Sequence, residues 1–114
     1  MIAVYGTLRE GHGNHGLIDG KKKWEGRIDG WVMHSLGGFP TCIPGDGTIT
    51  VEVWDVTPSS ARRVDALEGY PDFYDKVVVN TPVGDAEMYT CPLSRMASCG
   101  LIESGDWNDA RRNW

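Results

Sequence analysis

The sequence contains few cysteines and no long apolar segment, and each shortage excludes a class of protein. Its three cysteines, Cys42, Cys91 and Cys99, are odd in number and have no C-x-x-C spacing, which argues against a disulfide framework and a zinc ribbon. No segment approaches the ~20 apolar residues of a membrane span, and Met1 leads directly into a predicted strand rather than a signal peptide. We therefore expect a reduced, cytoplasmic protein without a membrane partner.

Positive charge is also scarce. There are 11 Lys and Arg residues against 16 Asp and Glu residues, so the formal net charge is -5, and the one basic run, Lys21-Lys22-Lys23, is short. Proteins that bind nucleic acid rely on Lys and Arg side chains to neutralise phosphates, so no nucleic-acid partner is expected. Nothing in the sequence indicates an oligomeric state.

The length and composition fit one small globular domain. A chain of 114 residues can bury a single hydrophobic core but not two, so we expect one domain over residues 1–114. Hydrophobic residues make up 40% of the chain and charged residues 24%, which is ordinary for a folded protein. The 15 glycines and 6 prolines favour short strands and frequent turns over long helices.

The first half of the chain predicts strands joined by glycine-rich turns. Residues 1–5 predict a buried strand and residues 6–13 a loop, after which Asn14 could cap a short helical turn toward Leu17. Residues 24–33 give a weak strand signal and end in a turn-rich stretch at 37–40.

The clearest strand covers residues 48–56, where apolar and polar residues alternate and Ile49, Val51 and Val53 share one face. The Gly-Asp-Gly segment at 45–47 predicts a turn before it. Later in the chain, residues 76–81 and 86–91 predict an antiparallel hairpin, and an irregular tail follows Pro92.

One helix is predicted from Pro58 to about Glu68. Thr57 is a favourable N-cap, proline is tolerated at the first helical position, and Gly69 is a typical stop.

Glu68 is the sharpest candidate for a functional residue. Three apolar residues share one stripe of the predicted helix: Ala61, Val64 and Leu67. At 100° per residue Glu68 falls on the same stripe, where burial would raise the pKa of its carboxyl toward that of a general base. The alternative is a frayed last turn that leaves the carboxylate exposed or paired with Lys76 or Arg62.

The segment Tyr5-Gly6-Thr7-Leu8 is the second candidate. It follows a buried strand, and glycine lets the backbone turn so that consecutive N–H groups face an anion or an oxyanion. The alternative is an ordinary turn at a strand end. Arg9 could pair with a ligand carboxylate, although an arginine is more often simply exposed to water.

Other reactive residues have weaker patterns. His12, His15 and His34 lack the spacing of a metal site, so no metal is expected, and Cys42 with His34 as base lacks a third orienting group. A small buried thiol is the simpler interpretation of Cys42. The tryptophans are interpreted as core and edge packing: Trp24, Trp31, Trp54, Trp107 and Trp114.

Taken in order, these segments resemble the γ-glutamylcyclotransferase-like family, most closely its γ-glutamylamine cyclotransferase and avirulence-induced-gene-like (AIG2-like) branch. The resemblance covers residues 1 to about 107. The segments that carry it are Val4-Tyr5-Gly6-Thr7-Leu8-Arg9, Asn14-His15, Gly38-Phe39-Pro40, Val51-Glu52-Val53, Asp65-Ala66-Leu67-Glu68-Gly69-Tyr70-Pro71 with Tyr74, and Ala86-Glu87-Met88-Tyr89.

The resemblance implies an α+β fold, a small mixed β-barrel with flanking helices, and a pocket between the first loop and the carboxylate. It implies that Glu68 is the catalytic acid and base. The residues that it implies for substrate binding are Tyr5, Gly6, Thr7, Leu8, Tyr74 and Tyr89. Lys76 departs from the arginine that many relatives carry there, which puts a bidentate contact at that position in doubt.

The implied reaction is a cofactor-independent release of 5-oxoproline from a γ-glutamyl compound, in which the substrate's own α-amine attacks its γ-carbonyl. The leaving group stays open: a simple amine, an amino acid or a modified lysine. One alternative is a non-catalytic module that binds a small ligand on the same fold. Another is an interaction protein that uses the tail from Trp107 to Trp114.

Overall fold

The computed structural model describes residues 1–112, and their side chains as far as Asp109. The strands are β1 (Ile2–Val4), β2 (Gly20–Ser35), β3 (Pro40–Val56), β4 (Asp75–Thr81), β5 (Gly84–Thr90) and β6 (Gly100–Ile102). The helical elements are the 3-10 turn η1 (His15–Leu17) and the helices α1 (Pro58–Glu68) and α2 (Trp107–Arg112). None of the described helices has the length and hydropathy to span a bilayer.

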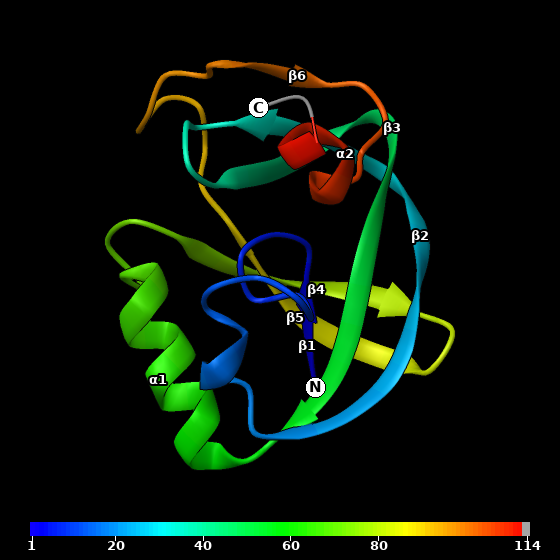
Figure 1. The fold of residues 1–114 in the computed structure, drawn as a ribbon, viewed down its shortest axis with the longest axis vertical. Helices are drawn as coiled ribbons and strands as arrows, with labels where there is room; N and C mark the ends of the chain where they lie inside the picture. Colours follow the sequence, from blue (N-terminus) through cyan, green and yellow to red (C-terminus); the bar gives the residue numbers. More distant parts are fainter. Residues whose placement is uncertain (113–114) are drawn as a thin grey trace.

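The strands form one mixed sheet in the order β4-β5-β1-β3-β2-β6. β1 is parallel to β5, and the other neighbours are antiparallel. The sheet curls into a half-barrel, with α1 on one side and α2 near the end that carries β6 (Figure 1). The α+β fold class predicted from the sequence, a small mixed β-barrel with flanking helices, is confirmed, with a barrel that does not close between β4 and β6.

β2 and β3 form a long paired ribbon, and the turn predicted at residues 45–47 is wrong. These residues lie inside β3, opposite a register shift in which Asp29 pairs with Thr48 and Trp31 with Pro44. A Cβ on Gly47 would lie 2.6 Å from the carbonyl oxygen of Trp31. The glycines therefore allow close strand contact at a bulge, a role that the sequence does not distinguish from a turn.

β1 separates two hydrophobic clusters. Its side chains alternate, so Ala3 and the following Tyr5 join one cluster while Ile2 and Val4 join the other. The first cluster includes Ile49, Val51 and Val53, which share a face as predicted. The second lies between the sheet and α1 and includes the fully buried Val64.

The tail after Pro92 is more regular than predicted, because it contains β6 and α2. Trp107 is 1% exposed and packs into the first cluster, so it does not form the exposed surface that an interaction tail needs. Trp54 is buried in the second cluster, and Trp24 and Trp31 are half-buried against the first, as the packing interpretation predicts. Trp114 lies outside the described residues.

The helix α1 has the predicted boundaries. Thr57 Oγ1 accepts a hydrogen bond from Ser60 N at 3.1 Å, and Gly69 ends the helix in the left-handed conformation with φ 65°. The predicted apolar stripe is only partly correct, because Val64 is buried whereas Leu67 is 43% exposed. Ser60 takes the place of an apolar contact: its hydroxyl donates to Leu17 O at 2.6 Å, so a polar side chain anchors this face.

The N-cap of α1 can be tested directly. We expect Thr57→Ala to lower the free energy of unfolding by about 1 kcal/mol, because the N–H of Ser60 loses its acceptor. Denaturant unfolding measures the change. Thr57→Ser is the control, since it keeps the accepting oxygen; an equal loss in both variants would contradict a capping role.

Candidate active site

A cavity of about 360 Å³ opens between the segment after β1, the end of α1 and the strand β5, a volume in the range of small-molecule sites. The catalytic and substrate-binding residues that the resemblance implies all line this cavity. Its lining consists of Ala3, Val4, Tyr5, Gly6, Thr7, Leu8, Asn14, Gly38, Phe39, Pro40, Leu67, Glu68, Phe73, Tyr74 and Tyr89. Segments that are distant in the sequence therefore meet at one place.

The segment from Gly6 to Arg9 is a tight turn closed by a hydrogen bond from Arg9 N to Gly6 O at 3.0 Å. Within the described part of the chain, the N–H groups of Thr7 and Leu8 donate to no protein acceptor. Leu8 is buried, so an N–H without an acceptor is costly there unless a ligand or water accepts from it. The turn is therefore suited to bind an anionic group.

The turn also lies very close to the start of β3. A Cβ placed on Gly6 would lie 2.8 Å from both Cδ and Cγ of Pro40, so only glycine fits without a shift. The close approach explains why glycine follows the strand here.

Asn14 and His15 hold the turn from the next segment. Asn14 occupies the N-cap position of η1, but its side chain makes no capping bond; its Nδ2 donates to Thr7 Oγ1 at 3.0 Å instead. The ring Nδ1 of His15 lies 2.8 Å from Leu8 O, and the ring packs 5.0 Å from that of Trp54. The side-chain cap predicted for Asn14 is wrong. The positions of Asn14 and Thr7 in the sequence do not by themselves indicate their contact.

Glu68 is the last residue of α1 and is half-buried in the cavity wall. Burial raises the pKa of its carboxyl to about 7, because the charged form loses hydration. Among the described residues none forms a hydrogen bond or ion pair with this carboxylate. The alternative pairing with Lys76 is not found, since the Lys76 ammonium lies 3.2 Å from Asp65 and 3.7 Å from Glu87.

Three tyrosine hydroxyls in the cavity wall donate to protein acceptors. Tyr5 donates to Tyr89 O and Tyr74 donates to Pro40 O, each at 2.8 Å, while Tyr89 donates to the carboxylate of Asp65. Burial raises the pKa of all three hydroxyls, so they stay neutral. The Tyr5 oxygen also accepts from Cys42 N at 3.2 Å, whereas the hydroxyl oxygens of Tyr74 and Tyr89 keep lone pairs as acceptors.

Both interpretations of Arg9 from the sequence, a ligand-binding residue and a solvent-exposed one, are wrong. Arg9 neither lines the cavity nor is exposed to water: it is 3% exposed, with Nε 3.1 Å from Glu52 and NH1 2.8 Å from Asp106. The partners lie far along the chain, so no local signal predicts them.

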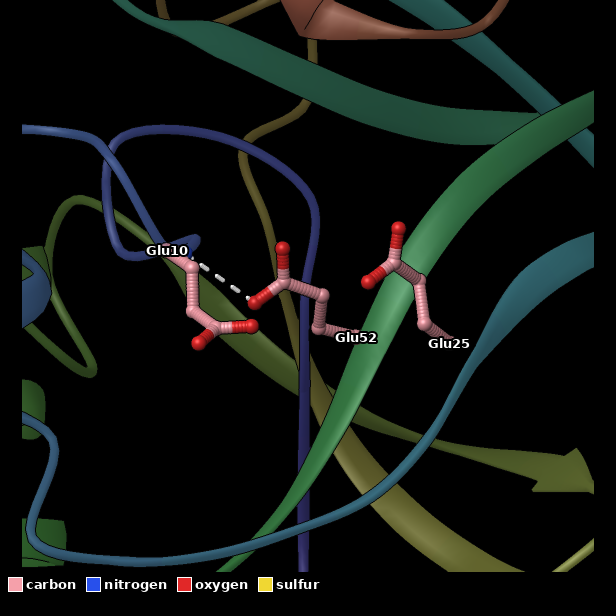
Figure 2. A group of neighbouring side chains, drawn as sticks. All are labelled: Glu10, Glu25 and Glu52. Atoms are coloured by element: carbon pink, nitrogen blue, oxygen red, sulfur yellow. Dashed lines mark hydrogen bonds between the residues drawn. The ribbon is translucent and has the colours of Figure 1, made fainter.

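Three carboxylates, Glu10, Glu25 and Glu52, have oxygen atoms within 4.8 Å of one another (Figure 2). Such a group could hold a cation. Here Arg9 contacts Glu52 and Glu25, and the ammonium of Lys22 contacts Glu10 and Glu25. The protein's own cations therefore supply the counter-charge, and we interpret the group as an ion-pair network.

The histidines and Cys42 do not come together into a site. His12 contacts Asn108, whereas His34, on β2, contacts Ser98 in the segment before β6. Cys42 is fully buried, and burial raises the pKa of its thiol, which makes it a poor nucleophile.

Comparison with known proteins gives consistent matches. The model of the family described as "Gamma-glutamyl cyclotransferase, AIG2-like" matches residues 2–109. The gamma-glutamylcyclotransferase family protein YtfP of Escherichia coli K12 is 36% identical over 111 residues, which cover 95% of this chain and 96% of YtfP.

Solved structures agree with this match. Protein PH0828 of Pyrococcus horikoshii superposes with a TM-score of 0.85 at 31% identity, covering 98% of this chain and 92% of that one. The solution structure of E. coli YtfP gives a TM-score of 0.75 at 33% identity, covering 96% and 97%. The resemblance seen in the sequence is confirmed: the chain belongs to the gamma-glutamyl cyclotransferase, AIG2-like family.

Proposed function

We propose that the protein is a γ-glutamyl cyclotransferase, which releases 5-oxoproline and a free amine or amino acid from a γ-glutamyl compound. The observation that carries the proposal is one unpaired carboxylate, Glu68, with a pKa of about 7 in the same cavity as the unpaired N–H groups of Thr7 and Leu8. Donors at one part of the wall and acceptors at another suit a zwitterionic amino-acid group.

In the proposed complex the turn of Tyr5, Gly6, Thr7 and Leu8 binds the γ-glutamyl group through backbone N–H donors. Tyr74 and Tyr89 line the pocket and offer hydroxyl oxygens as acceptors. The substrate is thereby held folded, with its α-nitrogen against its own γ-carbonyl carbon. Such orientation contributes strongly, since effective molarities of oriented ring closures reach ~10⁵–10⁸ M.

Glu68 moves the protons. The α-ammonium of the substrate gives one proton to Glu68, and the free amine attacks the γ-carbonyl to form the new C–N bond of the five-membered lactam. The old C–N bond then breaks as the leaving nitrogen is protonated. In total the α-nitrogen loses two protons and the leaving amine gains two, so Glu68 ends in its starting state. The substrate supplies the nucleophile, and the reaction balances without a cofactor.

The role of Glu68 is tested by Glu68→Gln. We expect kcat/KM to fall by about 10²–10⁴, the usual cost of losing an acid or base group, with the fold retained. The assay measures 5-oxoproline released from a panel of γ-glutamyl amines and γ-glutamyl dipeptides. For the wild type, kcat/KM should rise with pH through about 7, because the base form of Glu68 is needed.

Wild-type turnover in the glutamine variant would exclude Glu68 as the base. Tight binding of a γ-glutamyl compound that calorimetry detects without any 5-oxoproline would instead indicate the non-catalytic binding module.

Glu68→Gln should also differ from the wild type in its free energy of unfolding, in a pH-dependent way and without any substrate. The folded-state pKa of Glu68 lies near 7 and the ordinary value is 4.5, so the wild type loses stability as pH rises through this window. Gln carries no charge. We therefore expect Glu68→Gln to be more stable than the wild type by about 1–3 kcal/mol above pH ~7, and equally stable below pH ~4. Denaturant unfolding at both pH values measures this, and a pH-independent difference would contradict it.

The geometry of the turn is tested by Gly6→Ala. The new methyl group would press on Pro40 and shift the turn, so we expect kcat/KM to fall by about 10²-fold, as a ~1 Å misplacement can cost. Gly13→Ala is the control, because its Cβ would meet no atom within 4 Å. Equal kinetics in both variants would show that the turn does not position the substrate.

A further inference from the structure

Behind the turn, away from the cavity lining, lies a buried ion pair. The side chains of Arg9 and Glu52 are each 3% exposed, and Arg9 Nε donates to Glu52 Oε2 at 3.1 Å. The second carboxylate on Arg9 is that of Asp106, which accepts from NH1 at 2.8 Å and is 24% exposed. The guanidinium therefore joins the turn to β3 and to the segment before α2.

Glu52 also holds the backbone of the turn. Its Oε1 accepts from Glu10 N at 3.1 Å, the contact drawn as a dashed line in Figure 2, and from Trp54 Nε1 at 3.1 Å. Glu52 lies on β3 opposite Val4, the last residue of β1. The carboxylate of Glu52 therefore binds both the Arg9 side chain and the backbone N–H of Glu10, at the end of the turn.

This arrangement is a poor source of stability. Removing two charges from water costs several kcal/mol per ion, and apolar residues of similar volume often stabilise a protein as well or better. The pair instead fixes the relative orientation of the segments that it joins, since a guanidinium has donors in a fixed fork and carboxylates accept in fixed directions.

The C-terminal segment makes a second contact with the same loop. His12 Nε2 lies 2.5 Å from Asn108 Oδ1, and Asp106 Oδ1 accepts from both Arg9 and Asn108 N. Because α2 is anchored by the buried Trp107, this segment is a firm support for the loop.

We propose that Arg9, Glu52 and Asp106 form a brace of positioning residues, which keeps the N–H groups of Thr7 and Leu8 directed into the cavity. The consequence for the reaction rests on the proposed function, but the rigidity of the turn does not. None of the three residues lines the cavity, so the brace acts on the site through the residues that do.

The test compares Glu52→Gln with Glu25→Gln. Both remove one negative charge from the same group of carboxylates (Figure 2). Glu25 is 44% exposed, lies 3.8 Å from Arg9 and makes no contact with the turn backbone, which makes it a matched control. Glutamine keeps the size of the side chain, and circular dichroism with thermal unfolding establishes that each variant folds.

The first measurement is the ¹⁵N order parameter of the amides of residues 6–10 in the absence of substrate. In the wild type and in Glu25→Gln we expect the ~0.85 of a rigid backbone; in Glu52→Gln we expect values below ~0.6. Unchanged order parameters in Glu52→Gln would overturn the brace, whether or not the protein is a cyclotransferase.

The second measurement is kinetic. For Glu52→Gln we expect KM for a γ-glutamyl compound to rise at least about tenfold with a smaller change in kcat, since a displaced turn weakens substrate binding. The pH at which kcat/KM rises should stay near that of the wild type, because Glu68 is untouched. A drop in thermal stability with unchanged KM would overturn the positioning role.

Asp106→Asn provides the same test if Glu52→Gln does not fold. It keeps the pair of Arg9 and Glu52 and weakens the bonds that Asp106 accepts from Arg9 and from Asn108 N, so a smaller rise in KM and partial mobility of residues 6–10 are expected. Absence of both effects would overturn the proposal. If the wild type releases no 5-oxoproline, the proposed function fails, and the order parameters still decide the brace.

Discussion

The site depends on leaving a few polar groups unpaired although they are partly or fully buried. The carboxylate of Glu68 and the N–H groups of Thr7 and Leu8 have no protein partner among the described residues, although burial makes such groups costly. Neighbouring polar atoms of the wall are paired: the hydroxyls of Tyr5 and Tyr74, for example, both donate to backbone carbonyls. The surroundings must therefore be rigid enough to keep the unpaired groups from turning toward each other or toward water.

That rigidity comes from elements with different partners. α1 carries Glu68 at its last residue; Val64 packs the helix into the second cluster, and the hydroxyl of Ser60 ties it to η1 through Leu17 O. β1 is only three residues long, yet it lies in the middle of the sheet between β3 and β5 and carries the turn at its end. A short central strand with a cluster on each face cannot shift without disturbing both clusters.

The sequence predicts well what local rules control. Thr57, Pro58 and Gly69 define α1 because capping depends on neighbours in the chain, and the hairpin of β4 and β5 follows from alternation and a turn. Local rules fail where a distant partner decides. The glycines at 45–47 allow close contact with β2, and Arg9 is buried because Glu52 and Asp106 neutralise it. Leu67 stays partly exposed because the end of α1 lines the cavity. The candidate site residues follow from the ordered set of motifs rather than from any one pattern.

Burial is the cause of the raised pKa of Glu68, and the turn in the same cavity offers neutral backbone donors rather than a cation. A cation within about 4–6 Å of a carboxylate lowers its pKa by about 1–3 units, which would bring Glu68 back toward an ordinary acid and weaken it as a base. Arg9 is instead held by Glu52 and Asp106, and Lys76 by Asp65 and Glu87. Neutral N–H groups can donate hydrogen bonds to an anionic group without adding a full positive charge to the cavity. Burial then raises the pKa of Glu68 to about 7, so a cavity that bound an anionic group in the proposed way would retain its base.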